Sequence, residues 1–367
     1  MSSFAIFTDK DNNKFSIDVH FNLWNQSYND NYLDIGIMTY DLIKNQKLYI
    51  WLPFKINSEQ INDLKDSLED IDIINAIFNE NYILQREGKS KWINLYQRQK
   101  LQFRVYLLDI IKDIKIVDQE ALGFNKNENI SVLEIDVNFE EIDDIPKYLR
   151  FRVRLPEYTN IIHEYNRPHH FIRGAFSKNY IIDFRYNDKR SFSASENEII
   201  DTKYYLTKTK KLHFLLMTKV YVDVECSVNV RKRRLESNLW KKYVLNGDTV
   251  DIIAYHATKN IKEDNNSEDI GSWEFFAKQT VETKNWFLLL SFIILTIIFG
   301  AIGSIIGNNI ERIFLKLENL YHFITFKVGW NIWIILLLMS LVIFKKIIQK
   351  NNLKKTLKIF LSRYLKY

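Results

Sequence analysis

The sequence predicts an α+β protein: a cytoplasmic domain dominated by antiparallel strands, followed by two C-terminal transmembrane α-helices. Three observations predict this class. Apolar and polar residues alternate through most of residues 1–262, two long runs near the C-terminus carry no charge, and the positive excess is confined to that end. From Trp286 onward the chain has 11 of its 51 Lys and Arg residues but only 2 of its 45 Asp and Glu residues. A basic excess beside apolar runs points to an anionic membrane surface.

Alternation with a period of two residues predicts strands that bury one face. It is clearest where four apolar residues alternate with polar ones: Ile17, Val19, Phe21 and Leu23. Further strands are predicted at 33–40, 47–54, 101–108, 132–139, 149–155, 180–186, 212–230 (broken once) and 250–256. One helix is predicted to start after Asn57 or Ser58, with a buried face made of Ile61, Leu64, Leu68 and Ile71.

These elements predict a β-rich sensor or binding domain over residues 1–262, with a boundary between two lobes near 156–168. Residues 263–285 are predicted to be an acidic linker and a juxtamembrane helix. The single cysteine, Cys226, alternates with valines and fits a buried strand position. A β-rich chain without a disulfide framework, and without a signal peptide at its start, is typical of a reducing compartment.

Two uncharged stretches, 286–306 and 328–344, are predicted to cross a membrane. The first has 21 residues, which as a helix span about 30 Å, the thickness of the hydrocarbon core. The second has 17 residues, sufficient if the lysines that follow it extend to the interface. The alternative for either stretch is a buried core helix of a soluble protein.

The distribution of Lys and Arg predicts the orientation of the chain. The tail, 345–367, carries eight basic residues and no acidic one, whereas the outer amphipathic loop, 307–327, carries three basic residues. Positive charge stays inside, so a multi-pass protein of the inner membrane with both termini cytoplasmic is expected. The tail fits an amphipathic helix on an anionic inner leaflet or, alternatively, a disordered basic anchor.

Small and hydroxyl-bearing residues recur in the first span: Ser291, Thr296, Gly300, Gly303, Ser304 and Gly307. Small residues let helix backbones approach closely in lipid. The same residues would line a pore if four or more copies assembled, so a homo-oligomer, a tetramer or larger, is expected. A plain dimerising anchor explains them equally well. Neither span contains an ionisable residue, which argues against a proton relay or an ion-coupled transporter.

Charges on two predicted strands match each other. Glu134 and Asp136 share a face of one strand, and Arg152 and Arg154 share a face of another. An antiparallel register that pairs Glu134 with Arg154 and Asp136 with Arg152 would stabilise the pair by roughly 0.2–1 kcal/mol per contact. The alternative is a ladder of arginines, with Arg150, that binds phosphates.

No motif of a known catalytic, metal or cofactor site is present: GxGxxG, HExxH, CxxC and GxSxG are all missing. A non-enzymatic protein without metal or cofactor is therefore expected. Two basic patches are candidates for binding a nucleotide or short oligonucleotide. The first contains Arg167, His169, His170, Phe171 and Arg173, and the second is the run Arg231, Lys232, Arg233 and Arg234. Either patch is also explained as a solvated surface.

This layout, a motif-free cytoplasmic domain followed by the two uncharged spans and the glycine-rich packing of the first, resembles membrane effectors of bacterial anti-phage defence that respond to nucleotide or oligonucleotide signals, Hailong-type channel effectors among them. The resemblance implies an oligomeric ion channel gated by a cytoplasmic nucleotide. Two alternatives remain: a membrane-tethered receptor or scaffold whose helices only anchor and dimerise, and a tethered enzyme of unfamiliar family.

Overall fold

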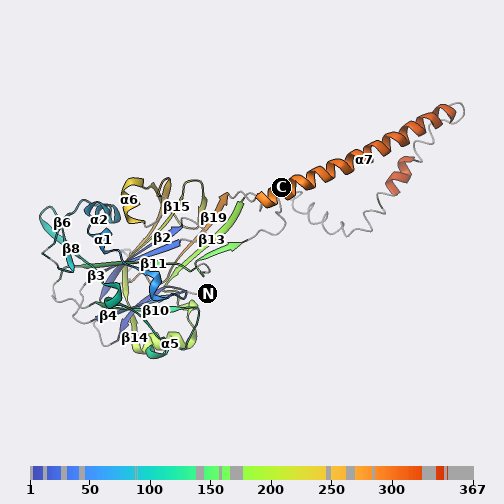
Figure 1. Ribbon diagram of the computed structural model, residues 1–367. Coiled ribbons are helices and arrows are strands. Elements are labelled where there is room, and N and C mark those ends of the chain that lie inside the picture. The colour runs from blue at the N-terminus through green and yellow to red at the C-terminus, as the bar shows by residue number, and fades with distance from the viewer. Residues whose placement is uncertain are drawn as a thin grey trace. The chain divides into compact units, whose positions relative to one another are not determined.

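The computed structural model describes most of the chain and divides it into two units, residues 1–285 and 286–367 (Figure 1). The described residues are 3–10, 15–25, 31–40, 46–86, 88, 90–137, 144–156, 159–165, 177–244, 249–261, 269–282, 286–324, 336–342 and 345. We call the first unit the body. It carries three β-sheets, and the long helix α7 belongs to the second unit.

The strands of the body are short and numerous. They are β1 (Ala5–Asp9), β2 (Ser16–Asn25), β3 (Asn31–Tyr40), β4 (Gln46–Leu52), β5 (Ile61–Asn62), β6 (Ile83–Gln85), β7 (Trp92–Gln97), β8 (Lys100–Tyr106), β9 (Ile114–Val117), β10 (Ser131–Val137), β11 (Lys147–Arg154), β12 (Ile162–Tyr165), β13 (Ser177–Tyr186), β14 (Tyr204–Leu206), β15 (Lys208–Lys219), β16 (Asp223–Cys226), β17 (Arg231–Arg234), β18 (Ile252–Asn260) and β19 (Trp273–Glu282). The helices are α1 (Lys65–Leu68), α2 (Ile71–Phe78), α3 (Ile110–Asp113), α5 (Ala194–Lys203), α6 (Ser237–Tyr243) and α7 (Trp286–Ile324), with short 3-10 turns at Ser58–Gln60, Glu120–Leu122 and Lys189–Ser191.

Within the described residues these strands form three sheets. The largest has ten strands, ordered β17-β18-β15-β2-β3-β11-β8-β7-β6, with β5 added beside β11. The five-stranded sheet has the order β14-β1-β4-β10-β9, and the four-stranded sheet has the order β12-β13-β19-β16. Pairing is antiparallel except between β15 and β2 and between β11 and β8. The antiparallel α+β class expected from the alternation is therefore confirmed for the body.

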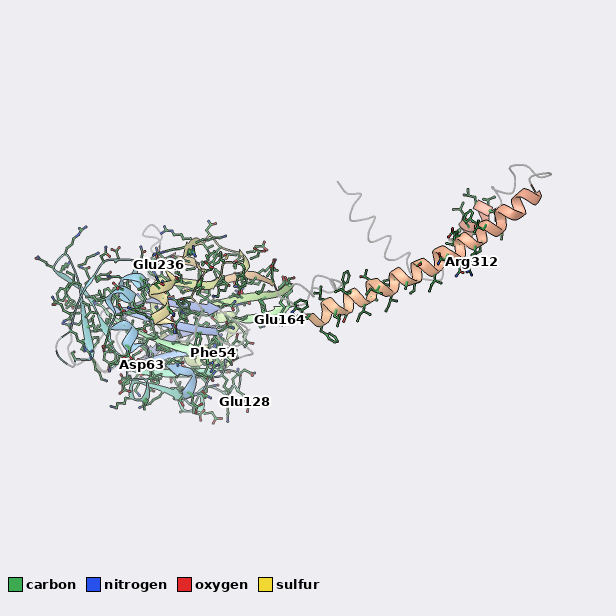
Figure 2. The ribbon with its side chains drawn as sticks, turned by 45° about the horizontal axis from the view of Figure 1, so that its top comes forward. Phe54, Asp63, Glu128, Glu164, Glu236 and Arg312 are labelled. Carbon is green, nitrogen blue, oxygen red and sulfur yellow. The ribbon has the colours of Figure 1, made fainter. Side chains whose placement is uncertain are left out.

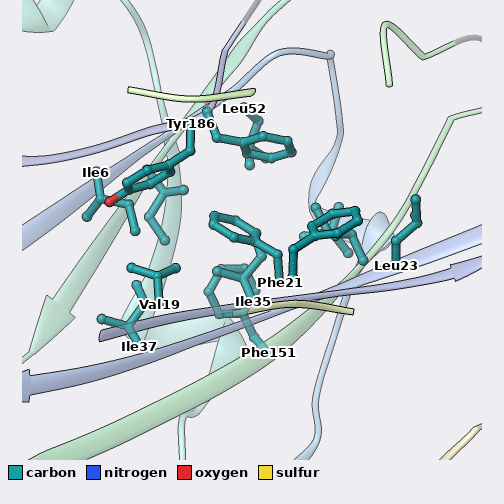
Figure 3. Close-up of a cluster of buried hydrophobic side chains, with 14 of the residues drawn as sticks. Ile6, Val19, Phe21, Leu23, Ile35, Ile37, Leu52, Phe151 and Tyr186 are labelled. Atoms are coloured by element: carbon teal, nitrogen blue, oxygen red, sulfur yellow. The ribbon is translucent and has the colours of Figure 1, made fainter. Parts of the chain in front are cut away.

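The central core lies between the inner faces of the sheets. The ten-stranded sheet contributes residues such as Phe21 and Ile35, the five-stranded sheet contributes Ile6, and the four-stranded sheet contributes Phe184 and Tyr186 (Figure 3). Each of these side chains is fully buried. Burying one aliphatic or aromatic side chain stabilises a fold by about 1.5–3 kcal/mol, so this cluster is the main source of the body's stability.

A second core covers the opposite face of the ten-stranded sheet. Helices α1, α2 and α6 pack there through Leu68, Ile73, Ile74 and Trp240. Because the side chains of a strand alternate between faces, this core receives the residues of β2 that lie between the apolar ones. Glu236, labelled in Figure 2, directly precedes α6. The polar face of β2 therefore does not simply face solvent.

The expected charge pairing of two strands is wrong. β10 and β11 lie in different sheets: β10 pairs with β4 and β9, and β11 pairs with β3, β5 and β8. Glu134 instead forms an ion pair with Lys47 at 3.0 Å. Arg150 and Arg152 of β11 face the second core, where they contact Tyr243, rather than β10. The reason is that alternation sets the face of a residue but not the partner strand.

Two predicted helices take other forms. The helix expected after Asn57 is divided into a 3-10 turn, the short strand β5 and the helices α1 and α2. The juxtamembrane helix expected within 263–285 is wrong for 273–282, because these residues form strand β19. Alternate residues of β19, Phe275, Ala277 and Gln279, are fully buried, and this period of two selects a strand.

Helix α7 contains one stretch, Leu289–Leu315, that is long and apolar enough to cross a membrane, and none of that stretch is buried. The helix does not end at residue 306, because 307–324 of the expected outer loop continue it. In the expected second span, 336–342 are helical, whereas 328–335 and 343–344 lie outside the described residues, as do 346–367 of the tail. One candidate span, not two, is therefore found in the described part of the chain.

Candidate functional site

Three of the chain's seven histidines meet on the helix-covered face of the ten-stranded sheet. They come from adjacent strands: His20 from β2, His213 from β15 and His256 from β18. The ring of His213 lies 4.8 Å from that of His20 and 5.2 Å from that of His256, centroid to centroid. His213 Nδ1 and His256 Nε2 are 3.0 Å apart, a hydrogen-bonding distance. We call these three residues the histidine row.

The row is held in its neutral form. Burial, then the neighbouring His213 and Arg150, lower the pKa of His20 well below 6.5. Burial, then His256 and Lys211, lower the pKa of His213 to about 4. Burial and Arg231 also lower the pKa of His256. Uncharged imidazoles offer one donor and one acceptor each, so at neutral pH the row is a polar surface that carries no charge of its own.

Cations surround the row. Three cations lower the pKa values of these histidines: Arg150 and Lys211 act on His20, Lys211 on His213, and Arg231 on His256. Lys211 precedes His213 by two residues on β15, and Arg231 lies opposite His256 in the register of β17 with β18. The nearby Asp18 does not oppose them fully, because burial raises the pKa of its carboxyl, which Tyr40 contacts at 2.7 Å.

A buried charge network lies next to the row on the same sheet face. Asp34 of β3 accepts hydrogen bonds from Arg152 through both oxygens, with Nη2 at 3.0 Å from Oδ2, and from Arg150 Nη2 at 3.2 Å. The hydroxyl of Tyr243 in α6 donates to the same carboxylate at 2.7 Å. We call these four residues the Asp34 clamp. Asp34 and both arginines are at most 1% exposed.

The charges of the clamp keep Asp34 ionised. Burial alone would raise the pKa of Asp34, but Arg152 and Arg150 outweigh burial and lower it below its usual value. Two guanidinium groups then face one carboxylate, which leaves a positive excess inside the body. The positive charge of Arg150 also acts on His20 and lowers its pKa.

Sheet register joins the clamp to the row. His213, His20, Gly36 and Arg150 lie in one line across β15, β2, β3 and β11. A Cβ atom at Gly36 would collide with the hydroxyl of Tyr148, and that hydroxyl accepts a hydrogen bond from Arg150 Nη1 at 2.9 Å. Glycine at position 36 therefore leaves room for the side chain of Tyr148, which lies over Gly36 between His20 and Arg150.

This arrangement is suited to holding an anion. Partly exposed imidazoles supply hydrogen-bond donors. Lys211 and Arg231 supply a positive field, which Asp18 offsets only in part because burial raises the pKa of its carboxyl. Neutral histidines are also metal ligands, but no group of three or more His, Cys, Asp or Glu residues in the searched part of the chain has the placement to hold a metal ion.

Of the two basic patches expected from the sequence, one lies among the described residues and the other does not. Arg167, His169, His170, Phe171 and Arg173 fall in 166–176, outside the described residues. Arg231, Lys232, Arg233 and Arg234 form β17, an exposed edge strand of the ten-stranded sheet. Arg233 is 2.6 Å from Glu236 and Arg234 is 2.5 Å from Asp251. Arg231 is the member of this run that adjoins the histidine row.

The residues singled out in the first span all lie on α7. At 3.6 residues per turn, five of them fall within about 100° of its circumference: Thr296, Gly300, Gly303, Ser304 and Gly307. Ser291 lies on the opposite side. No described atom stands within 4 Å of a Cβ built at any of the three glycines. The side chains of α7 project along its length, Arg312 among them (Figure 2).

The histidine row and the Asp34 clamp were not expected from the sequence. Alternation on β2 placed Asp18 and His20 on the face opposite the buried apolar residues. The three histidines are also far apart in the sequence: His213 follows His20 by 193 positions, and His256 follows His213 by 43. The sequence signal that could have indicated this site is a single polar residue between apolar ones on each of several strands. It becomes specific only when the strand order is known.

Comparisons with known proteins assign no family. No family model matches the chain, and no curated protein matches it. Among solved structures, the chain is similar to the Fcho1 Mu homology domain of Danio rerio with bound Eps15 peptide, with 7% identity, coverage of 76% of this chain and 79% of that chain, and a TM-score of 0.15. A likeness at that TM-score carries no argument about fold or function.

Proposed function

We propose that this protein is a membrane effector in which the body binds an anionic nucleotide or short oligonucleotide and the C-terminal helices form an oligomeric ion channel, in bacterial anti-phage defence. The observation that carries the proposal is the histidine row, on which the neighbouring cations Arg150, Lys211 and Arg231 act. A phosphate group brings the negative charge and the acceptor oxygens that such a surface lacks.

The membrane part of the proposal is supported by α7. None of its stretch Leu289–Leu315 is buried, and the stretch is long enough to cross a bilayer. The small-residue side of the helix, with Gly300, Gly303 and Gly307, has room for another helix to approach closely. We propose a multi-pass topology in the inner membrane, with 328–344 as the second crossing, both termini cytoplasmic, and assembly into a tetramer or larger.

Binding is tested on the full chain in detergent by calorimetric titration with adenosine triphosphate and with short 5′-phosphorylated oligoadenylates. His213→Gln, Lys211→Gln and Arg231→Gln are each expected to weaken binding by about tenfold, as the loss of a charge-assisted or buried hydrogen bond implies. Arg234→Gln is the control, because Arg234 is already paired with Asp251 at 2.5 Å. Equal affinity in all variants, or no binding of any of these probes, counts against the proposal.

Channel formation is tested by ion flux from vesicles that contain the full chain and the nucleotide. Gly303→Leu and Gly307→Leu place large side chains on the small-residue side of α7 and are expected to abolish flux. Ser291→Leu, on the opposite side, is the matched control and is expected to leave flux unchanged. Flux that survives the glycine substitutions would show that this side does not build the pore.

A second candidate function is a tethered receptor whose helices only anchor and dimerise. One observation favours it. The hydroxyls of Ser291 and Thr296 donate to the carbonyls of Phe287 and Phe292, both at 2.8 Å, so these side chains need neither water nor a partner helix. The receptor predicts nucleotide binding without flux under any trigger, and unchanged binding when another anchor replaces 286–367.

A further inference from the structure

Exposed apolar side chains gather at one tip of the body. Val220 and Tyr221 follow β15, and Val250 precedes β18; they are 52%, 60% and 53% exposed. The backbone N–H of Val220 donates to Asp251 O at 2.7 Å, and the register of β15 with β18 pairs Lys219 with Ile252. Extending that register by two residues places Tyr221 opposite Val250. We call Val220, Tyr221 and Val250 the apolar tip.

Hydrogen bonds fix the shape of the tip. The N–H of Val222 donates to Lys219 O at 3.0 Å, which closes a tight turn around Val220 and Tyr221. The ammonium of Lys219 donates to Val250 O at 2.9 Å and ties the two segments together. Val220 and Tyr221 are held on this turn, and Val250 is held on the segment tied to it. Little conformational entropy is therefore lost when a partner buries these three side chains.

The tip lies at the end of the body from which the chain leaves for α7. β16 starts at Asp223, two residues after Tyr221, and Asp223 pairs with Thr280 of β19. β19 ends at Glu282, and α7 starts at Trp286. Four Cα–Cα steps of 3.8 Å allow at most about 15 Å between these two residues. Chain connectivity therefore keeps the start of α7 within about 15 Å of this end of β19.

We propose that the apolar tip inserts into the interfacial layer of the bilayer that α7 crosses. This inference rests on the membrane attachment in the proposed function. Tyr favours the membrane–water interface, and Trp286 at the start of α7 has the same preference. The charges beside the tip match in number: Asp251 is paired with Arg234 at 2.5 Å, and Lys219 and Asp223 carry one positive and one negative charge. The occupant is accordingly the apolar layer of the lipid rather than its anionic headgroups.

The experiment uses the full chain in phosphatidylcholine vesicles, in a Cys226→Ser background. A fluorophore is attached at position 221 or 250 through Tyr221→Cys or Val250→Cys, and its quenching by lipids spin-labelled just below the headgroup is measured. Leu295→Cys reports on insertion of α7. Glu274→Cys, eight residues before Glu282 and so about 27 Å away along the strand, is the control for the far end of β19.

We expect quenching at 221, 250 and 295 but not at 274, with equal values when phosphatidylglycerol is added. Quenching at 295 without quenching at 221 and 250 overturns the tip inference and leaves the membrane proposal intact. Absence of quenching at 295 overturns both. Quenching of the tip only in the presence of phosphatidylglycerol also overturns the inference, because it would show attraction by headgroup charge.

A second set of variants tests whether the tip side chains, rather than the attached fluorophore, cause the insertion. With the label at 250, Val220→Asp together with Tyr221→Asp is expected to reduce quenching roughly threefold, because two carboxylates resist entry into the interface. Ile111→Asp is the matched control, since Ile111 on α3 is 90% exposed and lies outside the tip. Equal quenching in the double variant and the control contradicts the proposal.

Discussion

Asp34 holds four side chains in place at once. Its carboxylate accepts hydrogen bonds from Trp24, Tyr243, Arg150 and Arg152. Such a network is not evidence of great net stability, because removing charges from water offsets much of their attraction. It does specify one arrangement of β3, β11 and α6, because each donor is left unpaired if its strand shifts by one residue.

Asp34→Asn is expected to lower the free energy of unfolding by about 3–5 kcal/mol, because two guanidinium groups would remain buried without an anion. Denaturant titration followed by tryptophan fluorescence measures the change. Asp66→Asn is the matched control: Asp66 is exposed on α1, and a surface substitution is expected to change stability by no more than about 0.5 kcal/mol. Similar midpoints for the two variants would contradict the buried position of the clamp.

The histidine row predicts a loss of stability in mild acid. The pKa of His213 is about 4 in the folded protein against 6.5 for an ordinary histidine, so the unfolded chain binds this proton first. The contribution of neutral His213 to the free energy of unfolding is therefore fully present above pH 6.5 and is lost as the pH falls towards about 4. Each such proton lowers the free energy of unfolding by about 1.4 kcal/mol per pH unit within that window.

His213→Gln is expected to flatten this dependence between pH 6.5 and 4.5, measured by denaturant titration at several pH values. His163→Gln is the control, because His163 lies exposed on β12. Asp34 titrates below this window, since its pKa is below 3.8. Asp18, whose pKa is raised by burial, is present in both variants and does not account for a difference between them. An unchanged slope in His213→Gln would show that His213 is not held neutral.

At the scale of elements, α6 shows how a short helix is fixed by one side chain. The hydroxyl of Tyr243 donates to Asp34 and accepts from Arg150 Nε, both at 2.7 Å. A helix of seven residues has little stability of its own. The contact of Tyr243 with the sheet is therefore expected to set the rate at which α6 opens.

Tyr243→Phe is expected to raise amide hydrogen exchange in α6 while exchange in α5 stays unchanged. Loss of the hydroxyl leaves a buried guanidinium donor unpaired, which costs about 1–3 kcal/mol. Tyr221→Phe is the control substitution, since Tyr221 is 60% exposed. If exchange in α6 stays at the wild-type rate, its docking does not depend on this hydroxyl.

The sequence located most strands but not their partners. The period of two that predicted a strand over 33–40 is a local property, and β3 has nearly those bounds. The partner of β11 is decided by packing between distant segments, and for this reason the expected contact with β10 is wrong. The same limit applies to 273–282, where alternation was present but acidic residues nearby favoured a linker in the interpretation.

At the scale of the whole molecule, the candidate site depends on strand order. His20 and His213 meet because β2 and β15 are parallel neighbours across a large sequence separation, and no local pattern encodes that pairing. The apolar stretch of α7 needed no such information. Length and absence of charge are sufficient to identify it as a candidate span, whereas the choice between the proposed pore and an anchor depends on other copies of the chain.

The described cores of the body predict that it folds without residues 286–367. The three hydrophobic clusters draw on residues no later in the chain than Ala277, and none of Leu289–Leu315 is buried. A chain truncated after Asn285 is therefore expected to be monodisperse in buffer without detergent. Measured in the same detergent buffer, its thermal midpoint is expected to lie within about 3 °C of that of the full chain, a difference of about 1 kcal/mol at this size.

Truncation after Lys259 is the contrasting control. It removes β19, which pairs with β13 along ten residues and buries Phe275 and Ala277 in the central core, so loss of the cooperative transition is expected. If the body binds a nucleotide as proposed, the chain that ends at Asn285 is expected to bind it too, because the histidine row and the Asp34 clamp lie wholly within that chain. If that chain aggregates or melts without cooperativity, the body needs the C-terminal helices to fold, and the division of the protein into a binding unit and a membrane unit is wrong.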